Sequence, residues 1–115
     1  KFITHHCGSM VPYFEKRIKW IMPHKFGEDN PTQNSEVYFR RFYNDTALYG
    51  NTPGLMCGYA FFGADHLLFG TDAPLGARFG ITGDTLESVE QMDIPDADKQ
   101  KIFFKNAVNL LRLPT

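Results

Sequence analysis

The sequence predicts an α/β fold in which short parallel strands alternate with helices. Three observations support this prediction. Runs rich in apolar, aromatic or β-branched residues at 2–6, 43–48 and 66–69 have the length of buried strands. Each run is followed by helical material, and glycine or proline residues interrupt the chain between the segments. The strand–helix units recur at roughly 35 to 45 residues, which is within the range of βαβ organisation.

The first unit is a strand over residues 2–6 followed by a helix over residues 10–22. Pro12 is compatible with this helix because proline is accepted in a first turn. One helix face collects the apolar side chains Val11, Phe14, Ile18, Ile21 and Met22. Arg17 lies within the same apolar arc. Its guanidinium is either a snorkelling group, a member of an intrachain ion pair, or a carboxylate clamp that reaches across a subunit interface.

The second unit begins with a polar loop over residues 24–33, a short helix over residues 35–42 and the strand over residues 43–48. Thr52 is the expected N-cap of the next helix, and a proline follows it in the first turn. The helical segment LMCGYAFF, residues 55–62, is apolar almost all round. It is therefore expected to be buried on more than one side, and the glycine after it ends the helix.

The third unit starts with the strand over residues 66–69 and a loop that contains glycine and proline. Asp84 and Glu87 form a D-x-x-E signal that predicts a helix to about residue 92. Pro95 opens a further helix in which acidic residues come first and lysines come later, in agreement with the helix dipole. Residues 106–113 are expected to pack Val108, Leu110 and Leu111 against the rest of the fold.

Three parallel strands make a poor domain by themselves. Their outer strands would carry unpaired backbone groups, and parallel sheets require helices on both faces. The strand that begins at once after Lys1 also indicates that the 115 residues continue something longer. The sequence therefore predicts one partial domain over residues 1–115, made of three consecutive βα units of a closed (β/α)₈ TIM barrel, which needs about 250 residues.

The composition limits the classes of partner. The formal net charge is −1 and no basic stripe is present, which argues against a nucleic-acid partner. The longest apolar stretch, at residues 55–62, is too short to span a bilayer, and no signal peptide is recognisable, so no membrane partner is expected. Cys7 and Cys57 lie far apart, which fits two free thiols in the reducing cytoplasm better than a disulfide.

Side chains that could carry chemistry follow two of the predicted strands. His5 and His6 end the first strand, and Asp72 follows the third. In a barrel, residues just past the carboxyl ends of strands converge on one mouth, where an imidazole and a carboxylate can share a divalent metal or its water. Strand alternation lets only one of the two histidines face this mouth. The alternatives without a catalytic role are a turn or N-cap function for Asp72 and a structural function for the histidine pair.

Other polar residues are expected to be structural. Asp45 is interpreted as a turn or hydrogen-bonding residue, and His66 as a structural residue at the far end of its strand. His24 is expected to be solvated in its loop. Cys7 follows the histidines but has no visible His–Asp relay around it, so a nucleophilic role is not expected.

Four segments carry a resemblance to a known family: THHCGSMVPYFEKRI, FYNDTA, GADHLLFGTDAPLG and KNAVNLLRL. Together they resemble the amidohydrolase-related metal-dependent hydrolases, and most closely the subgroup of aminocarboxymuconate-semialdehyde and resorcylate decarboxylases. The H-x-G-x-x-x-P and G-T-D-x-P elements in this order make the resemblance specific. It covers nearly the whole chain, but only strands six to eight of the family's barrel.

The resemblance implies a role for each matching residue. Asp72 would ligate the metal, most simply zinc and alternatively manganese, and hold its water. His6 would act beside the metal as acid or base, with His5 pointing away. Arg17 would bind the carboxylate of a small-molecule substrate in the site of a neighbouring subunit, which implies a homo-oligomer. Asn106 matches a structural position of the closing helix.

The family's H-x-H pair and the histidine after its fifth strand have no counterpart in this sequence. With His6 and Asp72 alone, a metal would have at most two protein ligands, below the three usual at a catalytic zinc. The resemblance implies the C-terminal part of a decarboxylase of small aromatic or unsaturated carboxylic acids. The alternatives are a metal-dependent hydrolase of the same superfamily, and a non-catalytic oligomerisation module built on residues 55–62 and the arc around Arg17.

Overall fold

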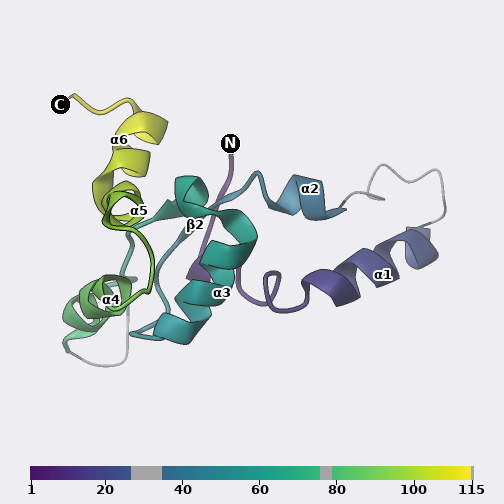
Figure 1. Ribbon diagram of the computed structural model, residues 1–115, viewed down its shortest axis with the longest axis horizontal. Helices are drawn as coiled ribbons and strands as arrows, with labels where there is room; N and C mark the ends of the chain where they lie inside the picture. Colours follow the sequence, from purple (N-terminus) through teal and green to yellow (C-terminus); the bar gives the residue numbers. More distant parts are fainter. Residues whose placement is uncertain (27–34, 76–78, 115) are drawn as a thin grey trace.

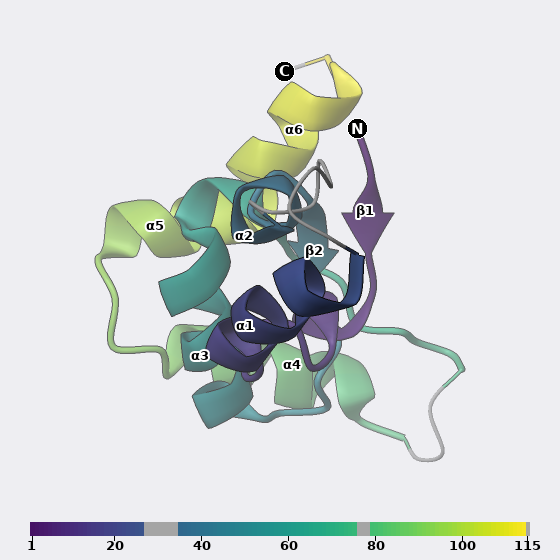
Figure 2. The same ribbon diagram turned by 90° about the vertical axis from the view of Figure 1, so that its right-hand side faces the viewer.

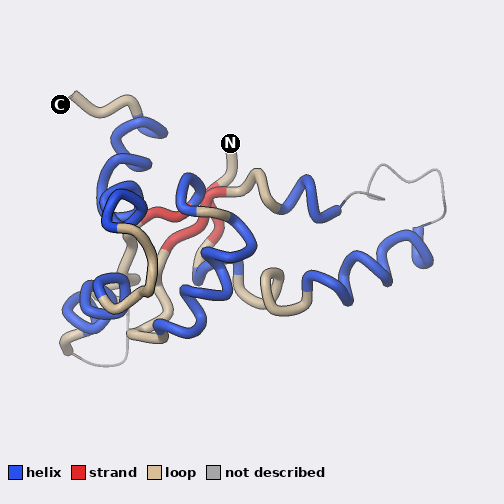
Figure 3. Tube along the Cα trace, viewed as in Figure 1, coloured by secondary structure: helices blue, strands red, loops and turns tan. Residues whose placement is uncertain are grey.

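Three short parallel strands lie side by side and are flanked by helices, as Figures 1 and 3 show. The computed structural model describes residues 1–26, 35–75 and 79–114. In chain order, the elements are β1 (Ile3–Thr4), the 3₁₀ turn η1 (His6–Gly8), α1 (Glu15–Phe26), α2 (Ser35–Phe39), β2 (Tyr43–Asp45), α3 (Thr52–Phe62), the 3₁₀ turn η3 (Ala64–His66), β3 (Leu67–Leu68), α4 (Ile81–Glu90), α5 (Asp96–Gln100), the π-helix η4 (Lys101–Lys105) and α6 (Asn106–Leu111). The predicted α/β class is confirmed.

The strands have the order β1-β2-β3, and all of them run in the same direction. Asn44 pairs with Thr4 on one side and with Leu67 on the other, so the three carboxyl ends are level. The buried Asn44 side chain strengthens this alignment, because its Oδ1 accepts a hydrogen bond from Thr4 Oγ1. The loops that follow the strands therefore leave the sheet at one common edge.

Helix α3 supplies the centre of the core. Its Leu55, Phe61 and Phe62 side chains are buried, and they join a cluster from the surrounding elements: Cys7, Leu67, Val89, Met92 and Ile102. The prediction that this helix is buried on more than one side is confirmed. Because its largest apolar side chains pack into the chain's own core, α3 offers less apolar surface to a partner than the oligomerisation alternative assumed.

A close approach between η1 and α3 depends on Gly58, which is buried in the second turn of α3. A methyl group at this position would overlap Cys7 Sγ. We expect Gly58→Ala to destabilise the complete protein by about 1–3 kcal/mol, since overpacking in a close-packed core displaces neighbours. The measurement is the urea midpoint of unfolding.

Gly83→Ala is the matched control for this substitution. Gly83 lies in α4 with nothing within 4 Å of the added methyl group, so alanine should be tolerated or slightly stabilising there. An unchanged urea midpoint for Gly58→Ala would contradict the close packing of η1 on α3.

Helices α1 and α2 project away from the sheet and pack against each other (Figures 1 and 2). Arg40, just beyond α2, joins them: its guanidinium contacts Glu15 at 3.3 Å and Glu36 at 3.1 Å. It also donates to the Phe61 carbonyl and lies 4.3 Å above the Phe61 ring. Two carboxylates and a carbonyl thus anchor α1 and α2 to the carboxyl end of α3.

The outer edge of β3 is closed by the C-terminal helical segment. In the π-helix, Asn106 N donates to Lys101 O, five residues back, and this frees the Ile102 carbonyl that a regular helix would use. Phe69 N donates to that carbonyl at 2.8 Å. The buried Asn106 Nδ2 donates to Ala64 O at 2.7 Å and to Leu67 O at 2.8 Å. Asn106 is therefore structural, as the resemblance implied.

The helix starts differ from their predicted positions where a neighbouring residue is the better cap. Asn51, rather than Thr52, caps α3, because Asn51 Oδ1 accepts from Gly54 N at 3.1 Å while the Thr52 hydroxyl donates to Ser88 O. Helix α4 begins at Ile81 after Gly80, whose φ is 94°, so Asp84 lies inside the first turn and is not the cap.

The first helix is also displaced. Turns occupy residues 9–14, and continuous α-helix begins at Glu15 rather than at residue 10. Its backbone continues through Pro23 to Phe26, because proline removes only one hydrogen bond from the ladder. His24 is thus helical and does not belong to a loop as predicted. Residues 27–33 of that predicted loop lie outside the described residues.

Within the described ranges, no helix combines the length and the apolar character needed to cross a membrane.

Candidate functional site

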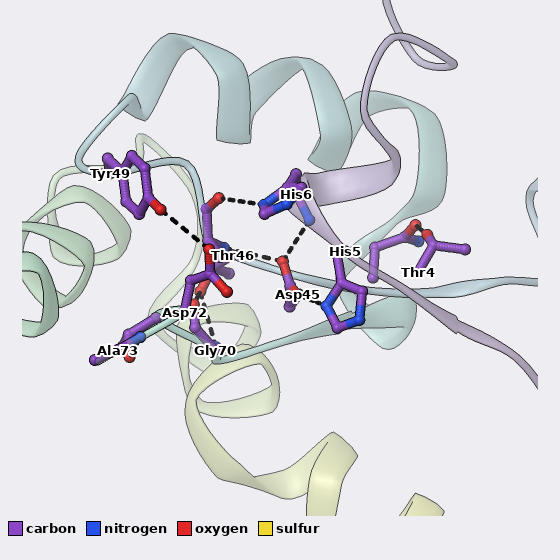
Figure 4. Close-up of polar contacts among 12 residues, drawn as sticks. Thr4, His5, His6, Asp45, Thr46, Tyr49, Gly70, Asp72 and Ala73 are labelled. Atoms are coloured by element: carbon purple, nitrogen blue, oxygen red, sulfur yellow. Dashed lines mark hydrogen bonds and ion pairs between the residues drawn. The ribbon is translucent and has the colours of Figure 1, made fainter. Parts of the chain in front are cut away.

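Polar side chains from three loops meet at the carboxyl edge of the sheet (Figure 4). His5 and His6 follow β1, Asp45 ends β2, and Asp72 follows β3. The sequence predicted that His6 and Asp72 lie just past the carboxyl ends of their strands, at one edge of the sheet. The strand order and the parallel direction of the strands place both residues at that edge. This edge is the candidate site.

Asp45 organises the side of the site that comes from β1. Its Oδ1 accepts hydrogen bonds from His6 N at 2.7 Å and from Ala47 N at 3.1 Å, and its Oδ2 lies 2.9 Å from His5 Nδ1. The Asp45 side chain is 15% exposed, whereas its partner His5 is 77% exposed. The prediction that Asp45 is a hydrogen-bonding residue is confirmed.

His5 does not point away from this edge, as the resemblance had implied on the basis that alternation lets only one of the two histidines face it. The argument fails because β1 ends at Thr4 and His6 adopts a φ of 55°. Beyond that point the residues no longer alternate between the faces of a strand. His5 instead contacts Asp45, and its ring centroid is 6.0 Å from that of His6.

The hydrogen bond of the His6 ring fixes which nitrogen carries a proton. Nδ1 lies 3.1 Å from the Ala47 carbonyl oxygen. Because a carbonyl only accepts hydrogen bonds, Nδ1 must be the protonated nitrogen in the neutral ring. Nε2 is then the nitrogen available to take or give a proton.

Asp72 is held from the neighbouring loop. Tyr49, between β2 and α3, donates its hydroxyl to Asp72 Oδ2 at 3.0 Å. This hydrogen bond raises the pKa of Tyr49, with smaller contributions from desolvation and from the negative charge of Asp72. The phenol therefore stays protonated and remains a donor at neutral pH.

Backbone strain gathers in these loops. Among the described residues, left-handed φ values at non-glycine positions occur at His6, Cys7, Ser9, Tyr49, Asp72 and Arg112. The first five follow the carboxyl ends of strands, and only Arg112 lies elsewhere, at the end of α6. Such conformations cost about 1–3 kcal/mol each and persist where a surrounding structure fixes them, often at functional sites.

Cys7 is unsuited to nucleophilic chemistry, in agreement with the sequence prediction. Desolvation by burial, followed by the charge of Asp45 and the nearby Cys57, raises the pKa of Cys7 to about 12. Its thiol is therefore protonated at neutral pH. His66 is structural as predicted: its Nδ1 lies 3.2 Å from Phe62 O, and its ring packs on Tyr43.

Arg17 is not brought to His6 and Asp72. It is exposed on α1, which projects away from the sheet in Figure 1, and it has no hydrogen-bond or ion-pair partner among the described residues. The predicted apolar surface around Arg17 is present in the structure. It forms an open hollow of about 560 Å³, lined by Arg17 together with Ser9, Met10, Val11, Phe14, Ile18 and Ile21.

The donor set suits a hard or borderline divalent cation but is incomplete. Asp72 offers a half-buried carboxylate, and among the described residues no hydrogen bond reaches its Oδ1. His6 adds an imidazole ring from the neighbouring loop. In the parts of the chain that the structure covers, no group of three His, Cys, Asp or Glu side chains is placed to hold a metal ion. These residues fit part of a metal site, and further ligands are required.

A sequence model of the amidohydrolase family matches residues 1–113. The chain belongs to the amidohydrolase family. The resemblance found in the four sequence segments is therefore confirmed, and so is the decarboxylase-like subgroup to which they pointed.

Two characterised relatives of this amidohydrolase chain are decarboxylases. The 6-methylsalicylic acid decarboxylase of Penicillium expansum is 30% identical over 105 residues, which cover 89% of this chain and 32% of the relative. The gamma-resorcylate decarboxylase of a Polaromonas species is 33% identical over 119 residues, with 98% and 34% covered. The chain thus spans about a third of the length of these relatives.

The fold is shared with solved decarboxylase structures. A dihydroxybenzoic acid decarboxylase from Polaromonas, with bound manganese and the inhibitor 2-nitroresorcinol, superposes with a TM-score of 0.76 at 30% identity. The match covers 98% of this amidohydrolase chain and 34% of that structure. The three parallel strands and their helices accordingly correspond to part of a TIM barrel, as predicted.

Proposed function

We propose that this chain forms the last three βα units of a metal-dependent decarboxylase that acts on small aromatic carboxylic acids. The observation that carries the proposal is the similarity to two such decarboxylases along nearly the whole chain. The meeting of a histidine and an aspartate from different strands at the carboxyl edge of the sheet supports it. The remaining strands of the barrel, and the missing metal ligands, would come from the rest of the polypeptide.

In this proposal Asp72 and His6 have separate tasks. Asp72 would ligate a divalent cation, which when bound would orient the substrate and polarise its oxygen atoms. His6, as imidazolium, would give the proton on Nε2 to the ring carbon that carries the carboxylate. The bond from that carbon to the carboxylate then breaks, carbon dioxide leaves, and the electron pair remains with the ring. His6 is left neutral, and Nδ1 keeps its hydrogen bond to Ala47.

Arg17 would act from a neighbouring copy in a homo-oligomer, where its guanidinium binds the substrate carboxylate. Its exposed place on α1, a helix that projects away from the sheet, and its lack of a partner in the described residues support a role outside its own subunit. The apolar hollow around Arg17 would then be covered by the other subunit, which would desolvate the guanidinium and strengthen its pairing with a carboxylate.

The metal and the compartment are further parts of the proposal. The resemblance implied zinc, with manganese as the alternative, and both ions are compatible with a carboxylate and an imidazole. Manganese is the ion bound in the Polaromonas decarboxylase, which supports the alternative. A cytoplasmic location is supported by the two free cysteines, Cys7 and Cys57.

The test is a decarboxylation assay of the complete protein. The metal is removed with a chelator and restored as zinc or manganese, and carbon dioxide release is measured with 6-methylsalicylate and gamma-resorcylate. We expect release from at least one of these acids, loss of release without metal, and recovery with one of the two ions. Hydrolysis of amide or ester substrates with no carbon dioxide release would overturn the decarboxylase and favour the hydrolase.

A further inference from the structure

The carboxylate of Asp72 is oriented by a residue from a different strand. Tyr49 lies in the loop after β2, Asp72 lies in the loop after β3, and the Tyr49 hydroxyl donates to Asp72 Oδ2 at 3.0 Å (Figure 4). Among the described residues this is the hydrogen bond that fixes the rotation of the carboxylate about its side chain. In the part of the chain that the structure describes, no hydrogen-bond donor reaches the other oxygen, Oδ1.

The loop holds Tyr49 in a defined place. Tyr49 has a φ of 53° and the next residue, Gly50, a φ of 90°, so the chain turns sharply at these two positions. Asn51 N donates to Leu48 O at 3.2 Å, which closes the turn around Tyr49. Asn51 also caps α3, and the turn is thereby fastened to the helix that contains the core.

The Asp72 backbone is fixed in a similar way. Its φ of 63° places it in the left-handed region, and its carbonyl accepts a hydrogen bond from Leu75 N at 2.8 Å. The loops after two adjacent strands thus each hold a strained residue, and the two strained residues bond to each other. Strain at two non-glycine residues is costly, and residues held in this way cluster at functional sites.

We propose that Tyr49 is a positioning residue that directs Asp72 Oδ1 toward the bound divalent cation, an inference that rests on the proposed function. Metal-ligating carboxylates are commonly held by an outer hydrogen bond that restricts their rotation. A neutral phenol suits this task because it orients the carboxylate without cancelling its charge. Tyr49 itself would touch neither the metal nor the substrate.

The test is the metal affinity of the Tyr49→Phe variant of the complete protein. Phenylalanine keeps the ring and removes only the hydroxyl. We expect the dissociation constant for manganese, measured by competition with a chelator, to rise by about tenfold or more. The thermal midpoint of the metal-free protein should stay the same, because an exposed hydrogen bond contributes little to folding.

Tyr59→Phe is a matched control. Tyr59 donates its hydroxyl to Asp98 at 2.7 Å, in the same chemical arrangement, but joins α3 to α5 instead of lying in the loops of the candidate site. This variant should keep the parent affinity for manganese. Equal weakening by both substitutions would overturn the proposal, since the effect would then be general.

An Asp72→Asn variant separates the failure of this inference from the failure of the proposed function. If Asp72→Asn weakens manganese binding and Tyr49→Phe leaves it within twofold of the parent, the positioning role is wrong while the ligand role stands. If neither substitution changes manganese binding, Asp72 is not a ligand, and both proposals fall. A Tyr49→Phe protein whose metal-free form melts earlier in proportion to its lost affinity would show a structural role instead.

Discussion

Replacing Asp72 with asparagine is expected to lower kcat/KM of the complete protein by about a thousandfold or more. Asparagine has nearly the same shape and accepts left-handed backbone conformations, so the φ of 63° at this position should be kept. What the substitution removes is the negative charge offered to the cation. A steady-state assay of carbon dioxide release, together with the metal content of the purified protein, measures the effect.

Asp65→Asn is the matched control for this prediction. Asp65 precedes β3 and Asp72 follows it, so the two carboxylates lie at opposite ends of the same strand. Asp65 is 73% exposed and forms an ion pair with Lys101 at 3.0 Å, whose loss should matter little. Normal turnover by the Asp72→Asn variant would contradict a role of Asp72 as metal ligand. It would leave the turn or N-cap role that the sequence also allowed for this residue.

The largest effect on stability is expected from Asn106→Asp. The substitution replaces an amide that donates to two carbonyls with a group that only accepts when ionised. Two hydrogen bonds would be lost, and a carboxylate would face two carbonyl oxygens in a buried site. Each unsatisfied buried group costs about 1–3 kcal/mol, so the complete protein should lose about 3 kcal/mol or more. Urea unfolding near neutral pH measures the loss.

Asn109→Asp makes the same chemical change in α6 at an exposed position. It should shift the urea midpoint only slightly, because surface substitutions are usually within about 0.5 kcal/mol. Equal effects of the two substitutions would mean that the general charge of α6, and not the contact of Asn106 with β3, controls stability.

The sequence was sufficient to predict the order of strands and helices, because apolar runs and helix periodicity reflect burial directly. It overestimated the strands: residues 2–6 were predicted, but β1 ends at Thr4. The cause is the left-handed backbone of His6 and Cys7. The residue types do not predict it, because positive φ is uncommon for any residue other than glycine, even for histidine, which is enriched there. The same left-handed backbone explains why strand alternation does not hold at His5 and His6.

The candidate site was predictable only in part. The position of Asp72 after an apolar run pointed to the carboxyl edge of a sheet, and His6 followed from the same rule. Tyr49 was missed because it lies outside every motif, and its link to Asp72 connects loops that are 23 residues apart. A tyrosine beside a glycine in a loop that follows a strand is the only local signal, and it is a weak one.

The two edge strands of the sheet, β1 and β3, differ in how open their backbone groups are to pairing with another chain. On the β3 side, two backbone groups already have hydrogen-bond partners. Phe69 N donates to the Ile102 carbonyl, and Leu67 O accepts from the Asn106 side-chain amide. On the β1 side, Phe2 and Ile3 are 70% and 47% exposed. Among the described residues, β1 therefore offers a foreign strand the more open template. Self-association of residues 1–115 in isolation should therefore begin there, and a charged residue at position 3 would be the simplest way to suppress it.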